Sequence, residues 1–317
     1  MFRRIAAALM ALGAFAAPQA QVQRALAQND TITIVEPFGV GGPSEQTIRV
    51  LRPALERALG TRVLVEHIGG PSGEVALARV MVASPGTRLL LVITDASRIF
   101  HEHLAKSPRR LDQLRPIAKL TDGISLCLAL APDAPNTSWD RFAAAAKAAP
   151  PTIAAAGPAS PSGVFLSIIE RHLGVAFPGK RYDLDAEILS AMARTHVPGV
   201  IATSSALSQA ARGQPNPVVL LTSGARRHPS LPDTPTLVDI TGNRRLAFTM
   251  SVGLFAPPTM PDVVVKALGR AVKEAGKDEA ARAEARRAHL PLAVQDAEVM
   301  RQTMARTQRV IRELLEK

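Results

Sequence analysis

The sequence contains little cysteine and few aromatic residues. Its single cysteine, Cys127, excludes a fold held together by internal disulfides, and its place in the apolar run Ile124–Leu130 predicts a small buried side chain. Aromatic residues make up 3% of the chain, which leaves little to stack on nucleic-acid bases. The chain is 47% hydrophobic and 21% charged, which excludes intrinsic disorder, and its 317 residues are enough for two domains.

Long apolar runs are absent after residue 27, because no later segment has 18 consecutive apolar residues. The start of the chain differs. Arg3 and Arg4 precede the uncharged apolar run Ile5–Ala17, and Ala25–Ala27 has the form Ala-x-Ala. As a helix this run spans about 20 Å, too short for a hydrocarbon core of about 30 Å. We therefore predict a secretory signal peptide over residues 1–27, cleaved near Ala27, and export to the periplasm.

A net positive charge is typical of proteins that bind nucleic acids, so the position of the charged residues in the chain decides how it is interpreted. The formal charge of the whole chain is +11, and residues 1–27 carry three arginines and no acid, so +8 remains after cleavage. An exported chain poor in aromatic residues does not fit a nucleic-acid partner. The remaining charge would instead draw acidic solutes toward the protein.

Strand-like and helical segments alternate along the rest of the chain. Apolar strands separated by helices predict a parallel sheet that is covered on both faces. In the first part, the expected strands are Thr31–Val35, Arg62–Glu66 and Arg88–Thr94, and the expected helices are Ser44–Leu59 and Glu74–Ala83.

A second α/β series follows the proline-rich segment Ala131–Pro135. The strand expected over Leu126–Leu130 precedes this segment. The expected strands of the second series are Thr152–Ala156, Val197–Ala202 and Val218–Leu221, and its expected helices are Trp139–Ala149, Val164–Leu173, Ala186–Arg194 and Ser205–Arg212. A further strand-like segment, Phe248–Ala256, follows them. The end of the chain, Pro261–Lys317, looks helical throughout, and Asp296 is a candidate N-cap for the last helix. This order predicts two lobes joined by two crossing strands, with lobe 1 formed by residues 28–130 and 254–317 and lobe 2 by residues 131–253.

Two glycine-containing loops could bind an anion. The loop Glu36–Ser44 leaves a strand and enters a helix, so its backbone amides and the positive end of the helix dipole would face a ligand. It lacks the third glycine of a dinucleotide fingerprint and the Gly-Lys-Ser/Thr of a P-loop. The loop Ala156–Gly163 has the same placement, and its serines could bind the other end of an anion. The alternative for each loop is a turn that binds no ligand. In the second loop, Ser160 and Ser162 would then be helix caps.

Several segments together resemble one protein family. Thr33–Glu45 resembles the Pro-Phe-x-x-Gly-Gly-x-x-Asp opening of the Bug proteins, the substrate receptors of tripartite tricarboxylate transporters. Ser230–Thr236 resembles their Leu-Pro-Asp-x-Pro-Thr element, and Gly253–Pro257 their Gly-Leu-x-Ala-Pro element. Matching segments cover nearly the whole chain after residue 27, and they also include Val65–Glu66, Gly69–Gly73, Leu89–Leu91 and Ala156–Gly157.

The resemblance implies a fold and a binding site. The implied fold is α/β: a two-lobed periplasmic binding protein of type II, a Venus flytrap, that closes on a small carboxylate. In the family the first loop holds a carboxylate through backbone amides and bridging waters, and small polar groups follow the third strand and line the second lobe. The residues that correspond here are Phe38, Gly39, Val40, Gly41 and Gly42, then Thr94, Asp95 and Ala96, and in the second lobe Ser160, Pro161, Ser162 and Thr203.

Two departures from the family leave the ligand open. The family often has an Asp in the loop that reads Ile201–Ser204 here, and it tends to have a small neutral residue where this chain has Asp95. An acid beside an anion site weakens carboxylate binding unless it turns away or meets a cation on the ligand. The expected ligand is therefore a small organic acid or an amino-acid-like solute.

The remaining motifs carry no catalytic or metal chemistry. His101–His103 lacks the His-Glu-x-x-His spacing of a zinc site and lies close to Lys106, which predicts a solvated surface. An exported hydrolase that uses the cleft is the alternative function, but Ser160 is not in a Gly-x-Ser-x-Gly turn. We expect a receptor and not an enzyme, without metal or cofactor, which acts as a monomer and delivers its ligand to a membrane permease or a sensor.

Overall fold

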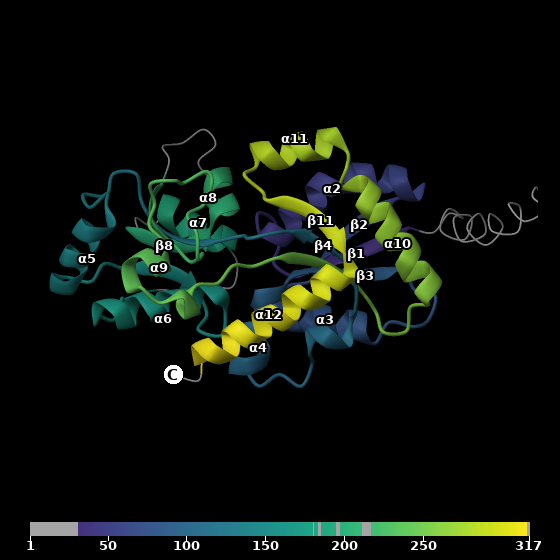
Figure 1. Ribbon diagram of the computed structural model, residues 1–317, viewed down its shortest axis with the longest axis horizontal. Helices are drawn as coiled ribbons and strands as arrows, with labels where there is room; N and C mark the ends of the chain where they lie inside the picture. The colour runs from purple at the N-terminus through teal and green to yellow at the C-terminus, as the bar shows by residue number, and fades with distance from the viewer. Residues whose placement is uncertain (1–30, 180, 183–184, 195–196, 211–216, 316–317) are drawn as a thin grey trace, which may run out of the picture.

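The computed structural model describes residues 31–179, 181–182, 185–194, 197–210 and 217–315. The signal peptide predicted over residues 1–27 lies outside these residues and stays a prediction. Figure 1 shows two lobes side by side, between which the chain passes twice. In the described part of the chain, no helix is long and apolar enough to span a membrane.

The lobe on the right of Figure 1 is built on a six-stranded sheet with the order β11-β4-β10-β3-β1-β2. Three of these strands, β1, β2 and β3, are parallel, whereas β10 runs antiparallel to both of its neighbours and β11 runs antiparallel to β4. Every residue of β3 is buried, as the run Leu-Leu-Leu-Val-Ile-Thr predicts. The strands are β1 (Ile32–Glu36), β2 (Val63–His67), β3 (Leu89–Thr94), β4 (Arg115–Thr121), β10 (Val252–Ala256) and β11 (Leu292–Asp296).

Helices cover both faces of this sheet. The chain moves outward from β1 to β2 and then back past β1 to β3, so right-handed crossovers place the two connecting helices on opposite faces. The helices of this lobe are α2 (Pro43–Leu59), α3 (Glu74–Met81), α4 (Asp95–Leu104), α10 (Asp262–Ala275), α11 (Glu279–Arg287) and α12 (Ala297–Leu315), with short 3-10 turns η1 (Pro71–Gly73) and η2 (Leu111–Gln113). In Figure 1, α10 packs beside α2, and α12 lies beside α4.

The other lobe repeats this arrangement on a five-stranded sheet with the order β7-β6-β8-β5-β9. Parallel strands β6, β7 and β8 correspond in connection and order to β1, β2 and β3. The strands are β5 (Leu126–Leu130), β6 (Ile153–Ala156), β7 (Arg181–Tyr182), β8 (Gly199–Thr203) and β9 (Val218–Thr222). The helices are α5 (Trp139–Ala148), α6 (Pro161–Leu173), α7 (Asp185–Arg194), α8 (Ser204–Ala210) and α9 (Leu237–Thr241), with the 3-10 turn η3 (Arg244–Leu246).

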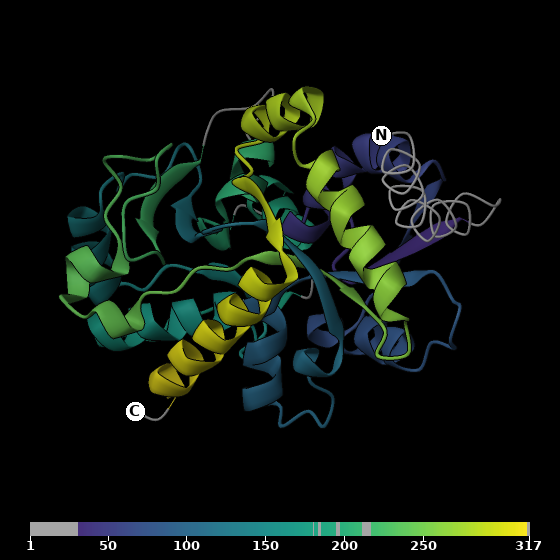
Figure 2. The same cartoon turned by 45° about the vertical axis from the view of Figure 1, so that its right-hand side comes forward.

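Two segments cross between the lobes and pair with each other. The chain leaves β4 for β5 through residues 122–125 and returns to β10 through residues 248–251. Midway, the Ile124 amide donates to the Met250 carbonyl at 3.0 Å, and the Met250 amide donates back at 2.8 Å. The last helix, α12, runs across this region and packs on η3 of the second lobe (Figure 2).

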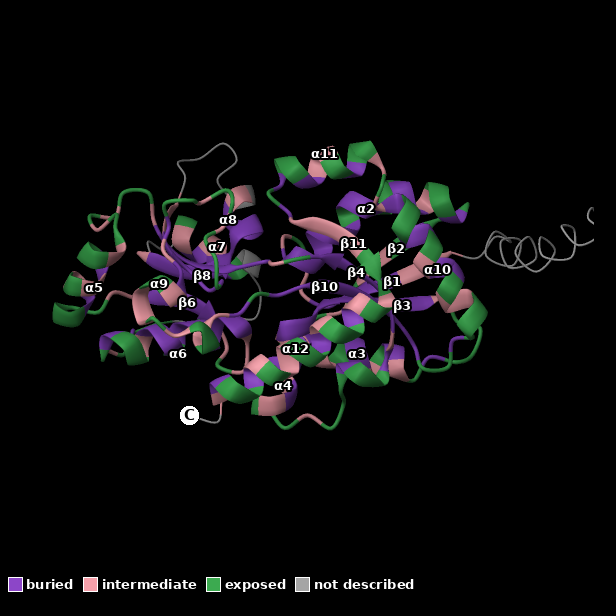
Figure 3. Cartoon of the chain, in the orientation of Figure 1, coloured by how far each residue is buried: buried purple, intermediate pink, exposed green. Residues whose placement is uncertain are grey.

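Apolar side chains fill the space where the lobes meet. Phe248, in the returning segment, packs edge-on against Phe100 of α4 and Phe165 of α6, with ring centroids 5.3 and 6.5 Å away. Figure 3 shows the central strands of both sheets as buried, whereas the edge strand β11 is largely intermediate or exposed. Cys127 of β5 is fully buried, which confirms the prediction, and burial raises the pKa of its thiol to about 12.

The α/β architecture with two lobes confirms the expected fold class, but the expectation of a parallel sheet is wrong, because antiparallel strands make both sheets mixed. Several elements also differ from the sequence-based prediction. The prediction of an all-helical end is wrong, because β11 interrupts it and pairs with β4. The sequence-based prediction also lacks β4, β7, α4 and α9. Asp296 does cap the last helix, since its carboxylate accepts from the amides of Glu298 and Val299. Strand β5, which the expected boundary at residue 130 assigns to lobe 1, is hydrogen-bonded within the second sheet.

Candidate functional site

A cavity of about 220 Å³ lies between the lobes, where the carboxyl ends of β1, β2 and β3 face those of β6, β7 and β8. This is the edge at which α/β sheets bind ligands, and the volume suits a solute smaller than a drug molecule. The first lobe contributes Phe38, Pro43, Pro71, Ser72, Thr94, Ser97 and His101; the second lobe and the crossing segments contribute Leu126, residues 156–162, Tyr182, Thr203 and Met250.

The loop between β1 and α2 reaches the cavity through Phe38 and Pro43. Two of its amides are already engaged by carboxylates of this chain: Phe38 donates to Glu36 at 3.0 Å, and Gly41 donates to Glu45 at 3.2 Å. The amides of Val40 and Gly42 make no hydrogen bond to the described part of the chain. Val40 is 67% exposed, and its side chain does not line the cavity.

Glu36 lies fully buried beneath this loop. Burial raises its pKa to about 7, and the Phe38 amide and the His67 ring, 3.1 Å away, only partly offset this effect. Its second carboxylate oxygen, Oε1, is buried without a hydrogen-bond partner. The acid therefore titrates near neutral pH, directly behind the candidate anion loop.

The loop between β6 and α6 presents two serines at the start of a 13-residue helix. The Ser160 hydroxyl caps the helix: it accepts from the Gly163 amide at 3.1 Å and donates to the Gly157 carbonyl at 2.6 Å. The Ser162 hydroxyl accepts from the Ala156 amide at 2.9 Å, which leaves its proton for Ser160, 3.3 Å away, or for a bound solute. Capping and cavity lining are therefore combined in the same residues.

Two adjacent residues at the start of α4, Thr94 and Asp95, point in different directions and have different roles. Thr94 lines the cavity and donates its hydroxyl proton to Ser97, 2.6 Å away and one turn later. Asp95 is fully buried and turned away, since its carboxylate accepts from the Ser251 amide at 2.8 Å and from the Thr307 hydroxyl at 2.7 Å. Burial raises the pKa of Asp95, and these bonds and Lys119 oppose the rise. Asp95 therefore joins α4 to the returning segment and to α12.

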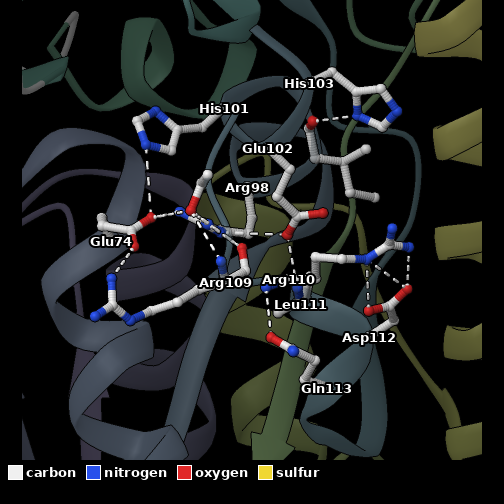
Figure 4. Close-up of polar contacts among 12 residues, drawn as sticks. Glu74, Arg98, His101, Glu102, His103, Arg109, Arg110, Leu111, Asp112 and Gln113 are labelled. Carbon is white, nitrogen blue, oxygen red and sulfur yellow. Dashed lines mark hydrogen bonds and ion pairs between the residues drawn. The ribbon is translucent and has the colours of Figure 1, made fainter. Parts of the chain in front are cut away.

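His101 lies one turn after Ser97 and also lines the cavity. The prediction of a solvated surface over His101–His103 is wrong, because the His101 side chain is 13% exposed and Glu102 is buried. Burial, together with nearby Arg98, lowers the pKa of His101, while Glu74 opposes this. Its ring nitrogen Nε2 lies 3.6 Å from the Glu74 carboxylate (Figure 4).

A buried arginine organises the side chains behind His101. Arg98 is fully buried and donates to Glu74 at 2.5 Å, to Glu102 at 3.3 Å and to the Ser107 hydroxyl at 2.7 Å. Glu74 also accepts from Arg109 at 2.8 Å, and these bonds hold its pKa below the usual range (Figure 4). The cluster fixes the position of α4 against the start of α3.

The electrostatics of the cavity come from dipoles and not from cationic side chains. No Lys or Arg is among the described residues that line it. Instead, three helices of ten or more residues, α2, α4 and α6, begin at its wall, where Pro43, Thr94 and Ser160 lie. Their positive ends and the surrounding hydroxyls favour a small anion. Within the described residues, no cluster of three or more His, Cys, Asp or Glu could hold a metal.

The structure brings half of the sequence-predicted site residues together at the cavity. Phe38, Thr94, Ser160, Pro161, Ser162 and Thr203 line it, whereas Gly39, Val40, Gly41, Gly42, Asp95 and Ala96 do not. The residues that the sequence reasoning missed include Ser72, Ser97, His101 and Tyr182. Thr94, Ser97 and His101 have the spacing of one helix face, a signal that becomes visible only once α4 is known to be a helix.

The serines of the cavity do not form a hydrolase centre. The hydrogen bonds of Ser160 and Ser162 go to backbone groups and to each other, and no histidine or carboxylate of the described chain activates either hydroxyl. A nucleophilic serine needs such a base within hydrogen-bond reach. The alternative of an exported hydrolase therefore has no support in this site.

Comparison with known proteins gives the same assignment by a separate route. Residues 47–316 match the model of a family described as "Tripartite tricarboxylate transporter family receptor". A UPF0065 protein of Bordetella pertussis is 26% identical over 248 residues, which cover 77% of this chain and 76% of that protein. A UPF0065 protein of Cupriavidus necator is 28% identical over 275 residues, which cover 86% and 82%.

Solved structures share the fold at lower sequence identity. The periplasmic binding protein BugD superposes with a TM-score of 0.81 at 20% identity, covering 90% of this chain and 96% of BugD. MatC from Rhodopseudomonas palustris, with bound malate, gives 0.76 at 24% identity, covering 89% and 98%. These similarities confirm the two-lobed periplasmic binding protein fold. The chain thus belongs to the tripartite tricarboxylate transporter receptor family, whose members are periplasmic solute-binding receptors and not enzymes.

Proposed function

We propose that this protein captures a small carboxylate between its lobes and presents it to the membrane permease of a tripartite tricarboxylate-type transporter. The observation that carries the proposal is the interlobe cavity, at which three helix N-termini and several hydroxyls converge without any Lys or Arg in its lining. Such a site compensates one or two negative charges by hydrogen bonds and dipoles. MatC with malate and the R. palustris protein Rpa4515 with adipate, which share the fold at TM-scores of 0.76 and 0.77, support a carboxylate ligand.

Capture is proposed to work by lobe closure about the crossing segments. The hinge lies in residues 122–125 and 248–251, so lobe 1 comprises the chain up to β4 and from β10 onward, and lobe 2 comprises β5 to β9. A solute that contacts Thr94 on one side and Ser160 on the other stabilises the closed form through its greater affinity for that form.

The remaining parts of the proposal concern the cell. Residues 1–27 direct export and are removed near Ala27, and the mature protein acts as a monomer in the periplasm. The solute is a small organic acid or amino-acid-like compound, and the protein has no nucleic-acid partner. The receptor family to which the chain belongs supports delivery to permease subunits.

The test uses Gly42, which precedes the first residue of α2. Its φ is −75°, and an added Cβ would lie 3.6 Å from the Phe38 Cβ, so a side chain fits here without strain. Gly42→Asp places a carboxylate at the start of α2, where it competes with the solute for the same amides. We expect the variant to fold and to lose the thermal stabilisation that a panel of small carboxylates gives the wild type.

Gly42→Asn is the matched control, because it has the same shape without the charge. It should keep most of the stabilisation. Equal binding by the wild type and Gly42→Asp would contradict the placement of the anion site at α2, and a wild type that binds no carboxylate would refute the proposed function.

A further inference from the structure

We propose that His101 determines the specificity of the cavity: it binds the second carboxylate of a dicarboxylate solute and takes up a proton when that carboxylate arrives. The proposal rests on the proposed function, since it requires an anion in the interlobe cavity. It adds to that function the class of solute, a dianion, and a change of protonation on binding.

His101 is placed to contact a solute. It lines the cavity from α4 on the same helix face as Thr94 and Ser97, opposite the serine loop of the second lobe. One ring nitrogen, Nε2, faces Glu74 at 3.6 Å, and Figure 4 shows the other nitrogen on the side away from Glu74. A solute whose first carboxylate lies at Ser160 and Ser162 would therefore extend across the cavity toward this ring.

The charges behind His101 are balanced before a solute binds. Glu74 and Glu102 are paired with Arg98 and Arg109, two acids with two bases, and all of these bonds point within the cluster. A second carboxylate in the cavity would therefore find no free cation, because the described lining has no Lys or Arg. Protonated His101 supplies that missing charge. Because the ring is largely buried, its ion pair with the solute carboxylate is screened less by water than a surface pair would be.

The direction of the proton transfer follows from the environment of His101. In the free protein, burial and Arg98 hold the pKa of His101 below its usual value, so the ring is neutral at pH 7. A carboxylate in contact favours the charged form and raises that pKa. Affinity for a dicarboxylate should then fall as pH rises, by up to about tenfold for each pH unit between the free and bound pKa values.

Other ionisable groups lie near the site, and their contributions to proton uptake can be separated from that of His101. Glu74 and Arg98 lie close to the ring, and Arg109 bonds Glu74 from the other side. These bonds hold the pKa of Glu74 below its usual range, so Glu74 does not take up a proton near neutral pH. Tyr182 lines the opposite wall. Glu36, behind Phe38, has a pKa of about 7, so its protonation also changes the loop near neutral pH, and Glu36→Gln removes that contribution.

The experiment is titration calorimetry with malonate, succinate, glutarate, adipate and malate as probes, together with succinamate, the monoamide of succinate. Each is measured at pH 7 in two buffers of different ionisation enthalpy, so that the difference in heat gives the protons taken up. We expect the dicarboxylate that binds most tightly to bring in a large fraction of one proton and succinamate to bring in none. In His101→Gln the uptake should vanish, and the affinity for that dicarboxylate should fall at least tenfold.

His103→Gln is the matched control, because His103 lies on the same helix, bonds the Ile99 carbonyl at 2.9 Å and does not line the cavity. It should keep both uptake and affinity. Wild-type protein that binds a dicarboxylate without proton uptake would overturn the proposal, whether or not His101→Gln folds. Uptake that persists when His101→Gln is combined with Glu36→Gln would overturn it too. A wild type that binds none of the probes would instead refute the proposed function, and this proposal with it.

Discussion

The contact between Gly163 and the serine loop gives a sharp prediction, because a single methyl group changes it. Gly163 is the third residue of α6, and a Cβ there would lie 2.3 Å from the Gly157 carbonyl oxygen and 2.8 Å from the Pro158 Cα. Carbon and oxygen normally approach to about 3.3 Å, so Gly163→Ala must move the loop by about 1 Å. Gly157 and Pro158 line the cavity, so the wall of the site moves with them.

The stability effect is a difference of two terms. Overpacking typically costs about 1–3 kcal/mol, and Ala in place of Gly returns up to about 1 kcal/mol of helix propensity. We expect a net loss of about 1–2 kcal/mol in the free energy of unfolding. At about 2–4 °C per kcal/mol, Tm falls by about 2–8 °C. Carboxylate affinity should fall at least tenfold, because the loop amides and serines are displaced.

Gly269→Ala in α10 is the matched substitution without the clash. The nearest atom to a Cβ there is the Ile117 carbonyl oxygen at 3.5 Å, an ordinary contact. The same change should therefore raise Tm by about 2–4 °C and leave binding unchanged. Differential scanning calorimetry and carboxylate titration measure both effects. A Gly163→Ala protein with wild-type Tm and affinity would refute the idea that close packing of this loop shapes the cavity.

Two further predictions concern buried charges. Arg98→Met should lower the free energy of unfolding, measured in urea, by about 3–5 kcal/mol, because it leaves Glu74 and Glu102 without their buried partner. Arg110→Met, which removes an exposed pair, is the control and should cost less than about 1 kcal/mol. Equal effects of the two substitutions would contradict the structural role of Arg98. Glu36 has a folded-state pKa of about 7 against an ordinary value of 4.5, so the folded protein binds the extra proton and stability should fall as pH rises between these values, by on the order of 3 kcal/mol in total. Urea unfolding at pH 5 and pH 8 should show this slope in the wild type and a flatter one in Glu36→Gln, and a wild type that gains stability over this range would refute the assignment.

The pattern of apolar residues predicted the strands whose apolar runs are uninterrupted. The strand Leu126–Leu130 has the expected bounds, and β3 is as buried as its apolar run indicates. Strand β4 could not be found in this way, because it contains Pro116, and proline rarely occupies a central strand. The sheet accommodates Pro116 at a shift in register, where it faces Phe255, and such irregularities arise from tertiary pairing.

The buried polar residues behind the cavity could not be predicted from the sequence either. Arg98 reads as a surface residue in the sequence, and it is fully buried only because Glu74, from a helix 24 residues earlier, reaches it. This long-range pair joins α4, which carries His101, to the start of α3. Thr94 and Ser160 could be predicted because Thr94 ends β3 and Ser160 lies in the loop that follows β6, and the carboxyl ends of parallel strands share one edge.

The position of β10 has a consequence for how the chain folds. Strand β10 lies between β3 and β4 in the first sheet, yet it follows the whole second lobe in the sequence. Without β10, β4 has no neighbour among the strands made before it, so the first 121 residues cannot close their sheet as the chain emerges. The second lobe, residues 126–222 with their following helices, is continuous and meets no such delay. The order of assembly can therefore differ from the order of synthesis: the lobe made in the middle can close first, and the amino-terminal lobe waits for the last fifth of the chain, which begins with β10.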